Sequence, residues 1–337
     1  MLRRVTLHDV ADYAEVSVTT VSNVVRDWPH ISHETREKVQ RAIHELGYIP
    51  HPIAQGLRTG LTQVIGFIAP SLADPYFASM VSVAEDVARQ RDYSLHVFNT
   101  CENENREVES IRRASQRLVD GLLIAQVSTG KYTTDVVAEV NIPVVAIDRI
   151  PEGFSGPSCR VDNLRAGELV MGHLYELNHR KIAHLAGPST VRPARERLEA
   201  YQVARSLYGL TYERIVFVSS MWDYHEGHRA MQQILDDDIL PTAIFASNDR
   251  MAIGASHAIQ GRGLRVPQDI SVVGVDDIEI SEYLNPPLTT VHQPIEDMAR
   301  SGIDLLLRLL KNEVPDDIHR VLQPSLVVRQ SSQVART

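Results

Sequence analysis

From about residue 61 onward, short apolar runs alternate with amphipathic helical stretches. The apolar runs lie at 64–69, 94–99, 121–125 and 144–148, and the helical stretches lie at 76–91, 104–118 and 132–140. Short runs that are apolar throughout are typical of strands covered on both faces. Because parallel neighbours need a crossover connection, this alternation predicts a parallel α/β lobe.

The same alternation repeats further along the chain. Strands are predicted at 182–186, 215–219, 243–247 and 271–275, with helices at 164–177, 195–207, 224–235, 249–260 and Ile295–Leu310. At 337 residues the chain is too long for one core. We therefore expect two doubly wound parallel-sheet lobes, and the last helix is expected to rejoin the first of them.

Residues 5–47 carry the signals of three short helices. Thr6 is a candidate N-cap with Asp9 three residues on, Ser17 caps the second helix, and the third runs from the cap Ser32 to Gly47. The first two helices are separated by only a turn, which predicts a helix-turn-helix in an all-α head. By itself this pattern is equally typical of an αα-hairpin in a helical core.

The second helix is expected to bury Val21, Val24 and Val25. Its remaining side chains are small, which lets a helix enter the major groove of DNA. Those expected to point outward are Val18, Thr19, Ser22 and Asn23.

Four strings in this region resemble the lactose repressor family of bacterial transcription regulators: VTLHDVADYAEVSVTTVSNVV, SHETREKV, ELGYIP and AQGLR. The resemblance implies a helix-turn-helix domain over 1–50 and a hinge helix over 51–60. In this family two hinge helices pack side by side in the minor groove, and Leu57 would wedge into the central base step. Gly56 weakens so short a helix, so the hinge is expected to fold only on DNA.

The head is not basic by count, because residues 1–60 hold as many Lys and Arg as Asp and Glu. Phosphate contacts must then rely on a few placed cations, helix N-termini and hydroxyls. The resemblance places Val18, Thr19 and Asn23 at the base-reading positions. The complete set of predicted DNA-binding residues is Thr6, Ser17, Val18, Thr19, Thr20, Ser22, Asn23, Ala54 and Leu57.

For residues 61–337 the resemblance implies a clamp like that of periplasmic binding proteins, which serves effector binding and dimerisation. Lobe 1 would hold residues 61–161 and 292–323, and lobe 2 residues 162–291 and 324–337. The chain would cross between them near 161, 291 and 323. Such a clamp binds its ligand at the carboxyl ends of the strands.

Polar side chains occur at those strand ends. Asp148, Asn248 and Asp276 each follow a predicted strand, and Arg197 lies near the start of a helix. The resemblance places these four where a sugar's hydroxyls are held, with Trp222, Tyr76 and Phe77 as pocket aromatics. Each has an ordinary alternative: Asp and Asn after strands commonly cap the next helix, and the aromatics could be core anchors.

The predicted function is a sequence-specific DNA-binding transcription regulator, a repressor, controlled by a small-molecule effector that is a sugar or sugar derivative. A purine is disfavoured, because the family's purine-binding member has an arginine and a threonine where this chain has Val191 and Pro193. The alternative function is a cytoplasmic sugar-binding sensor or enzyme on the same fold. No nucleotide-binding, nucleophile-elbow or zinc-protease motif occurs, so we predict no catalytic residues, no cofactor and no metal site.

Localisation and partners follow from the same observations. No run of about eighteen apolar residues is present, and Asp9 and Asp12 lie where a signal peptide is apolar, so a cytoplasmic, nucleoid-associated protein is expected. The expected partners are a pseudo-palindromic double-stranded operator, a carbohydrate effector and a second copy of the chain. Residues 331–336 contain no leucine heptads, which predicts a homodimer without the family's tetramer-forming tail.

Overall fold

The computed structural model describes residues 5–25, 28–48, 61–116, 119–126, 131–218, 222–313 and 315–336. The chain divides into two compact units, Met1–Thr62 and Gln63–Thr337, which are described one at a time. Two predicted DNA-binding residues, Ala54 and Leu57, lie outside the described residues, as does the predicted hinge over 51–60.

The first unit contains helices α1 (Leu7–Tyr13), α2 (Val18–Val25) and α3 (His33–Leu46). Thr6 and Asp9 form a reciprocal capping box at the start of α1, as predicted. Gly47 ends α3 in the left-handed conformation, with φ of 62°, which glycine adopts without strain. The three helices share one core, built around Val10, Ala11, Ala14, Val21, Val24, Val39 and Ala42.

Lobe 1 of the second unit is a six-stranded parallel sheet covered by helices on both faces. The strand order is β11-β5-β4-β3-β1-β2. The strands are β1 (Val64–Ala69), β2 (Ser94–Asn99), β3 (Gly121–Ile124), β4 (Val144–Ile147), β5 (Ser158–Val161) and β11 (His319–Leu322). The helices are α5 (Pro75–Arg89), α6 (Glu104–Ser115), α7 (Lys131–Glu139) and α12 (Ile295–Leu310).

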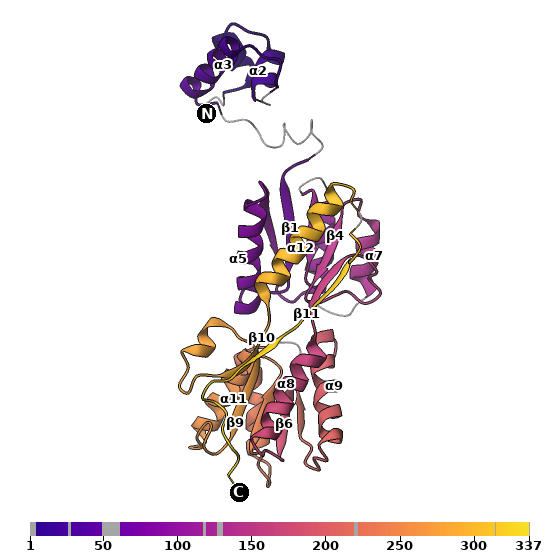
Figure 1. Ribbon diagram of the computed structural model, residues 1–337, viewed down its shortest axis with the longest axis vertical. Coiled ribbons are helices and arrows are strands. Elements are labelled where there is room, and N and C mark those ends of the chain that lie inside the picture. The colour runs from indigo at the N-terminus through magenta and orange to yellow at the C-terminus, as the bar shows by residue number, and fades with distance from the viewer. Residues whose placement is uncertain are drawn as a thin grey trace. The chain divides into compact units, whose positions relative to one another are not determined.

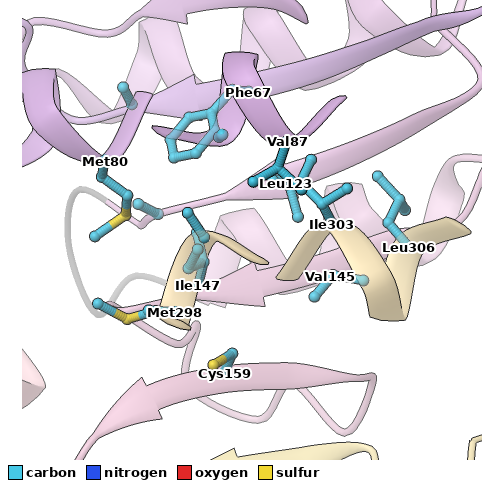
Figure 2. Close-up of a cluster of buried hydrophobic side chains, with 14 of the residues drawn as sticks. Phe67, Met80, Val87, Leu123, Val145, Ile147, Cys159, Met298, Ile303 and Leu306 are labelled. Atoms are coloured by element: carbon cyan, nitrogen blue, oxygen red, sulfur yellow. The ribbon is translucent and has the colours of Figure 1, made fainter. Parts of the chain in front are cut away.

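Alternate residues of strands β1, β2, β3 and β4 face opposite cores. On β1, Phe67 packs with α5 and α12, whereas Ile68 packs with α6 and α7. Figure 1 shows α12 lying along the strands of this lobe. Figure 2 shows part of the core on that side, where Phe67 and Leu123 from the sheet meet Met80 of α5 and Ile303 of α12. Because both faces are covered, the central strands β1, β3 and β4 are apolar throughout.

Lobe 2 repeats this plan with strand order β12-β10-β9-β8-β6-β7, in which only β12 pairs antiparallel, with β10. The strands are β6 (Ile182–Ala186), β7 (Ile215–Phe217), β8 (Ala243–Ala246), β9 (Ser271–Asp276), β10 (Thr289–His292) and β12 (Ser325–Val327). The helices are α8 (Asn163–Glu176), α9 (Arg192–Leu207), α10 (Tyr224–Leu235) and α11 (Asp249–Gly261), with a short 3-10 turn, η1 (Glu279–Glu282). The predicted class of two doubly wound α/β lobes is confirmed.

The chain crosses between the lobes at three places, after β5, after β10 and after β11. The sequence analysis did not predict β5, β10, β11 or β12 as strands. Three of these carry the crossings, and β11 and β12 have exposed positions that break the apolar run. β11 and β12 are edge strands, β5 and β10 lie next to them, and all four contain polar residues, so hydrophobic patterning marks them less strongly than it marks the central strands.

Helices α10 and α11 are in unusually close contact at two glycines. A Cβ added to Gly254 would lie 2.0 Å from the Tyr224 carbonyl oxygen and 2.7 Å from the His228 nitrogen. A Cβ on Gly227 would lie 2.3 Å from the Met251 carbonyl oxygen. Backbone atoms cannot yield as a side chain can, so these glycines fix how closely the two helices pack.

Gly254→Ala should therefore lower the free energy of unfolding by about 2–3 kcal/mol, because the helices must separate to admit the methyl group. Gly261→Ala, on the same helix, is the matched control, since nothing lies within 4 Å of its added Cβ. It should be neutral or stabilising by up to about 1 kcal/mol. Urea unfolding midpoints at unchanged slope measure both effects. Equal midpoints for the two variants would contradict the close-contact argument.

Candidate functional site

All seven predicted effector-binding residues line one cleft between the two lobes. Each sheet has the doubly wound order whose switch point lies between its first and third strands, and the cleft lies where the carboxyl ends meet. The sequence analysis missed further lining residues at the same ends. The complete lining is Asp74, Tyr76, Phe77, Asp148, Arg149, Pro193, Arg197, Trp222, Asn248, Asp276 and Gln293.

Two of the aspartates lie on strained backbone. Asp148, after β4, has φ of 60°, and Asp276, at the end of β9, has φ of 134°. Residues other than glycine rarely adopt these φ values, and such backbone strain concentrates at binding sites. The turn that follows each strand thus directs a carboxylate toward the cleft.

A chain of hydrogen bonds crosses the cleft through Gln293. The Tyr76 hydroxyl lies 2.8 Å from Asp148 Oδ1 and 3.2 Å from Gln293 Oε1. The Gln293 amide donates to Asp276 Oδ1 at 2.7 Å. Gln293 lies just past β10, at a crossing between the lobes, so this network joins the polar groups of both lobes.

Arg197 is almost completely buried and is held from two sides. Its Nε donates to Asn163 Oδ1 at 2.9 Å, and one terminal nitrogen donates to the Ser247 carbonyl at 2.5 Å. The same nitrogen is 3.9 Å from Asp276 Oδ1, and the guanidinium carbon lies 5.9 Å from the centre of the Trp222 ring. These contacts fix the orientation of the guanidinium, which suits it to paired hydroxyls.

Arg149 is the second buried guanidinium of the cleft. It pairs with Glu102 at 3.1 Å and lies 4.9 Å from the centre of the Phe77 ring and 5.5 Å from that of Trp222. Phe77 belongs to lobe 1 and Trp222 to lobe 2. The adjacency of Arg149 to Asp148 at a strand end was the signal that could have identified it.

Asn248 caps the helix that follows it, which is the ordinary alternative to a ligand-binding role. Its Oδ1 accepts from the Met251 nitrogen at 2.9 Å and caps α11, while its amide donates to the Trp222 carbonyl at 2.9 Å. One amide hydrogen is left to face the cleft. The indole nitrogen of Trp222 is buried and has no hydrogen-bond partner among the described residues. Both groups could therefore donate to a ligand oxygen.

The space between these side chains is about 20 Å³, room for about one water molecule. Burial raises the pKa of the Asp148 carboxyl despite nearby Arg149 and the Tyr76 hydroxyl. It likewise raises the pKa of Asp276 and of the Tyr76 hydroxyl well above their usual ranges. These groups are thus desolvated, and Tyr76, Asp148, Gln293 and Asp276 are bonded to one another, so a ligand that contacts these four must replace their bonds.

In the head, the Ser17 hydroxyl caps α2 by accepting from the Thr20 nitrogen at 3.1 Å. Thr6, Ser17 and Thr19 are exposed, and Val18, Thr20 and Asn23 are half-buried. The expectation that Ser22 points outward is wrong, because it is only 6% exposed. Ser22 lies on one line with Val18 and Val25, which both pack against the head core, so the buried stripe of α2 is wider than predicted.

Two other findings bear on site chemistry. Among the described residues, no group of three His, Cys, Asp or Glu side chains is arranged to hold a metal ion. Within the same residues, none of the helices has the length and apolar composition needed to span a bilayer.

Known proteins share both units. A family model described as bacterial regulatory proteins of the lacI family matches residues 6–51, and a periplasmic binding protein-like domain matches residues 171–332. The ribose operon repressor of Escherichia coli K12 is 35% identical over 324 residues, which is 95% of this chain and 94% of that protein. The chain belongs to the LacI family of bacterial regulatory proteins.

This LacI-family regulator is also similar to the transcriptional repressor PurR of Pasteurella multocida, at 33% identity over 97% of this chain and 98% of that protein. In a crystal structure of the lac repressor dimer bound to operator and the anti-inducer ONPF, the repressor chain matches with a TM-score of 0.88 at 34% identity, covering 98% of this chain and 100% of that one. These relatives are repressors rather than enzymes, so the predicted function class, a DNA-binding transcription regulator, is confirmed.

The α2 face leads to a prediction about base recognition. Asn23→Ala should weaken binding at the preferred operator by about 1–3 kcal/mol and relax base choice at one position per half-site, because an asparagine amide can pair bidentately with adenine. Gln40→Ala, which removes an exposed amide from α3, is the control and should bind as wild type does. Selection from random DNA followed by titration measures both. An unchanged base preference in Asn23→Ala would reject this assignment.

The buried carboxylate leads to a second prediction. Since burial raises the folded-state pKa of Asp148, the folded protein retains that proton to higher pH than the unfolded chain, and stability falls as the pH rises. Asn adopts a φ of 60° readily, so Asp148→Asn should melt higher than wild type at about pH 7.5, by a margin that shrinks toward about pH 4.

Asp269→Asn provides a control of opposite sign. Hydrogen bonds from Arg265 lower the pKa of Asp269, so its ionised form stabilises the fold above the unfolded-state pKa. Its replacement should melt lower than wild type near neutral pH, and the deficit should vanish as the pH falls. Melting curves of the ligand-free proteins decide between the two trends, and parallel trends would contradict the argument.

Proposed function

We propose that this regulator is a repressor that binds operator DNA as a dimer and whose DNA affinity is controlled by an uncharged sugar of pentose size. The observation that carries the proposal is the cleft itself: buried carboxylates, guanidinium groups and an amide converge from both lobes around two aromatic rings. Hydroxyls pair with the polar groups, and the C–H faces of a sugar ring pack on aromatic rings.

Charge pairing in the cleft favours an uncharged ligand. Arg149 pairs with Glu102, Arg197 lies beside Asp276, and Asp74 pairs with Arg250 at 3.2 Å. Only Asp148, among the charged lining residues, has no ion-pair partner within 4 Å in the described chain. An anionic sugar would add its negative charge to that of the unpaired Asp148 carboxylate, and two like charges repel strongly at low dielectric.

A small ligand fits the observations better than a large one. The cleft holds little free space, so every added ring atom requires further displacement of its walls. The relative at 35% identity is a ribose operon repressor. A purine base is the second candidate, since a PurR repressor is similar over 97% of this chain and the Phe77 and Trp222 rings could also contact a planar base.

Control follows from linkage between two sites. The effector contacts both lobes, so its binding changes the equilibrium between lobe arrangements. A dimer whose heads bind a two-fold operator depends on that arrangement, and the effector and the operator therefore change each other's affinity by the same factor. The proposed base-reading residues are Val18, Thr19 and Asn23, with Thr6, Ser17 and Thr20 at the backbone. The proposed location is the cytoplasm, on the nucleoid.

A thermal-shift panel of pentoses, hexoses, sugar phosphates and purine bases tests the proposal. A specific effector at about a hundred times its dissociation constant should stabilise the protein by roughly 2.7 kcal/mol. Arg197→Lys should lose most of that shift, because a lysine keeps the charge but not the two-pronged donor geometry. It should still bind operator DNA.

Arg214→Lys is the matched control, since Arg214 pairs with Asp237 within lobe 2, away from the cleft. Its ligand shift should equal that of wild type. If a purine base is the only compound that shifts the melting temperature, the effector is the second candidate and not a sugar. If folded Arg197→Lys shows the same ligand-induced thermal shift as wild type, the effector binds outside this cleft.

A further inference from the structure

A buried histidine lies near the buried arginine of the cleft. His184, in the middle of β6, is completely buried, and its Nδ1 lies 2.9 Å from the Phe245 carbonyl oxygen on β8. A carbonyl oxygen can only accept, so Nδ1 carries the ring hydrogen. Burial, aided by the charge of Arg197, lowers the pKa of His184 to about 4. The ring is therefore neutral near pH 7, and its Nε2 can only accept.

Ser247 provides the hydrogen for this acceptor. Its hydroxyl oxygen lies 3.4 Å from His184 Nε2, a long hydrogen bond, and accepts from the Gly187 nitrogen at 3.0 Å. Because the Gly187 nitrogen can only donate, the hydroxyl hydrogen is directed to His184. Ser247 follows β8, is completely buried and does not line the cleft. A neutral imidazole thus orients one buried hydroxyl.

Ser247 is bonded to the groups that hold two side chains of the cleft. Its carbonyl accepts from a terminal nitrogen of Arg197 at 2.5 Å. The Gly187 backbone, bonded to its hydroxyl, lies against the Trp222 ring, since a Cβ added to Gly187 would lie 3.1 Å from two ring atoms. The next residue, Asn248, donates to the Trp222 carbonyl at 2.9 Å. Ser247 therefore links the guanidinium and the indole, which both line the cleft.

The His184 ring also packs against both elements that carry these contacts. It stacks on Tyr201 of α9, with 5.1 Å between ring centres and 21° between ring planes, and it lies 4.4 Å from the Phe245 ring centre. Tyr201 lies four residues after Arg197, on the same face of α9. Phe245 lies two residues before Ser247. His184 therefore sets the spacing between α9 and the end of β8 by packing as well as by hydrogen bonds.

We propose that His184 and Ser247 are positioning residues for effector binding: the imidazole orients the Ser247 hydroxyl, and Ser247 keeps Arg197 and Trp222 at the spacing that the ligand requires. Neither His184 nor Ser247 lines the cleft, so both act through residues that do. A guanidinium that is oriented before binding loses less freedom on binding. The effector part of this inference rests on the proposed function, whereas the positioning of Trp222 can be measured without ligand.

Ser247→Ala should weaken D-ribose binding by about three- to tenfold, because the Gly187 nitrogen and His184 Nε2 lose their common partner. Ser271→Ala is the matched control. Ser271 is completely buried at the start of β9, the strand end away from the cleft, and its hydroxyl accepts from the Gln333 nitrogen at 3.2 Å. This control should lose similar stability in melting curves yet bind D-ribose as wild type does in calorimetric titration. Wild-type affinity in folded Ser247→Ala would overturn the proposal.

Replacement of His184 separates positioning from packing. His184→Leu fills the site but cannot accept a hydrogen bond, so it should weaken D-ribose binding as Ser247→Ala does. His184→Gln offers a carboxamide oxygen and should restore most of the affinity. In the double variant His184→Leu/Ser247→Ala the two losses should not multiply, because both changes break the same bond. Losses that multiply, or equal losses in His184→Leu and His184→Gln, would overturn the role of His184.

Trp222 fluorescence tests the positioning without ligand. The chain has two tryptophans, so Trp28→Phe leaves Trp222 as the sole emitter. In that full-length protein, Ser247→Ala should raise the acrylamide quenching constant by about 1.5-fold or more, because the backbone against the indole loosens, and Ser271→Ala should not. If wild type binds neither D-ribose nor any ligand of the panel, the proposed function fails and quenching alone decides. Unchanged quenching in Ser247→Ala would overturn the positioning of Trp222.

Discussion

The arrangement of the cleft depends on the buried carboxylate of Asp249, the first residue of α11. One oxygen accepts from the Ile278 nitrogen at 3.0 Å and from the Ser281 hydroxyl at 2.7 Å, and the other accepts from the Thr290 hydroxyl on β10. Gly274 makes room for this carboxylate, because a Cβ there would lie 2.2 Å from its oxygen. One side chain thus ties a helix start, the turn after β9 and a crossing strand together. Burial raises its pKa to about 6, so the ionised form is held at a cost near neutral pH and protonation in mild acid stabilises the fold relative to the unfolded chain.

The neighbours of Asp249 show what that anchor makes possible. Asn248 caps α11 and faces the cleft, and Arg250 reaches across to lobe 1. Three consecutive residues therefore provide a helix cap and a cleft-facing amide, an internal anchor, and an interlobe contact. Asp249 holds the backbone nitrogen of Ile278, whose side chain packs into the core of lobe 1. A ligand that moves the lobes must therefore act against apolar packing as well as against hydrogen bonds.

Part of the polar lining of the cleft is bonded within itself, and part is bonded to groups behind it. Tyr76, Gln293 and Asp276 form one connected network, and Arg197 is bonded to Asn163 and Ser247. A buried polar group without a partner costs more than one such bond contributes, and the Trp222 indole nitrogen is such a group among the described residues. A ligand that displaces the bonds among Tyr76, Gln293 and Asp276 must offer hydrogen bonds in their place. This requirement selects for hydroxyl-rich ligands and against apolar ones of the same size.

The sequence by itself determined the element types and the cleft residues at strand ends, because apolar periodicity and caps such as Thr6 and Asn248 are local signals. It did not determine β5, β10, β11 and β12, which lie at or next to one edge of their sheets and whose burial depends on neighbours far along the chain. Nor could it identify Gln293 or the pairing of Asp74 with Arg250, residues 176 positions apart. Only the tertiary structure brings such groups together, since the attraction between charges depends on distance and burial and leaves no periodic trace in the sequence.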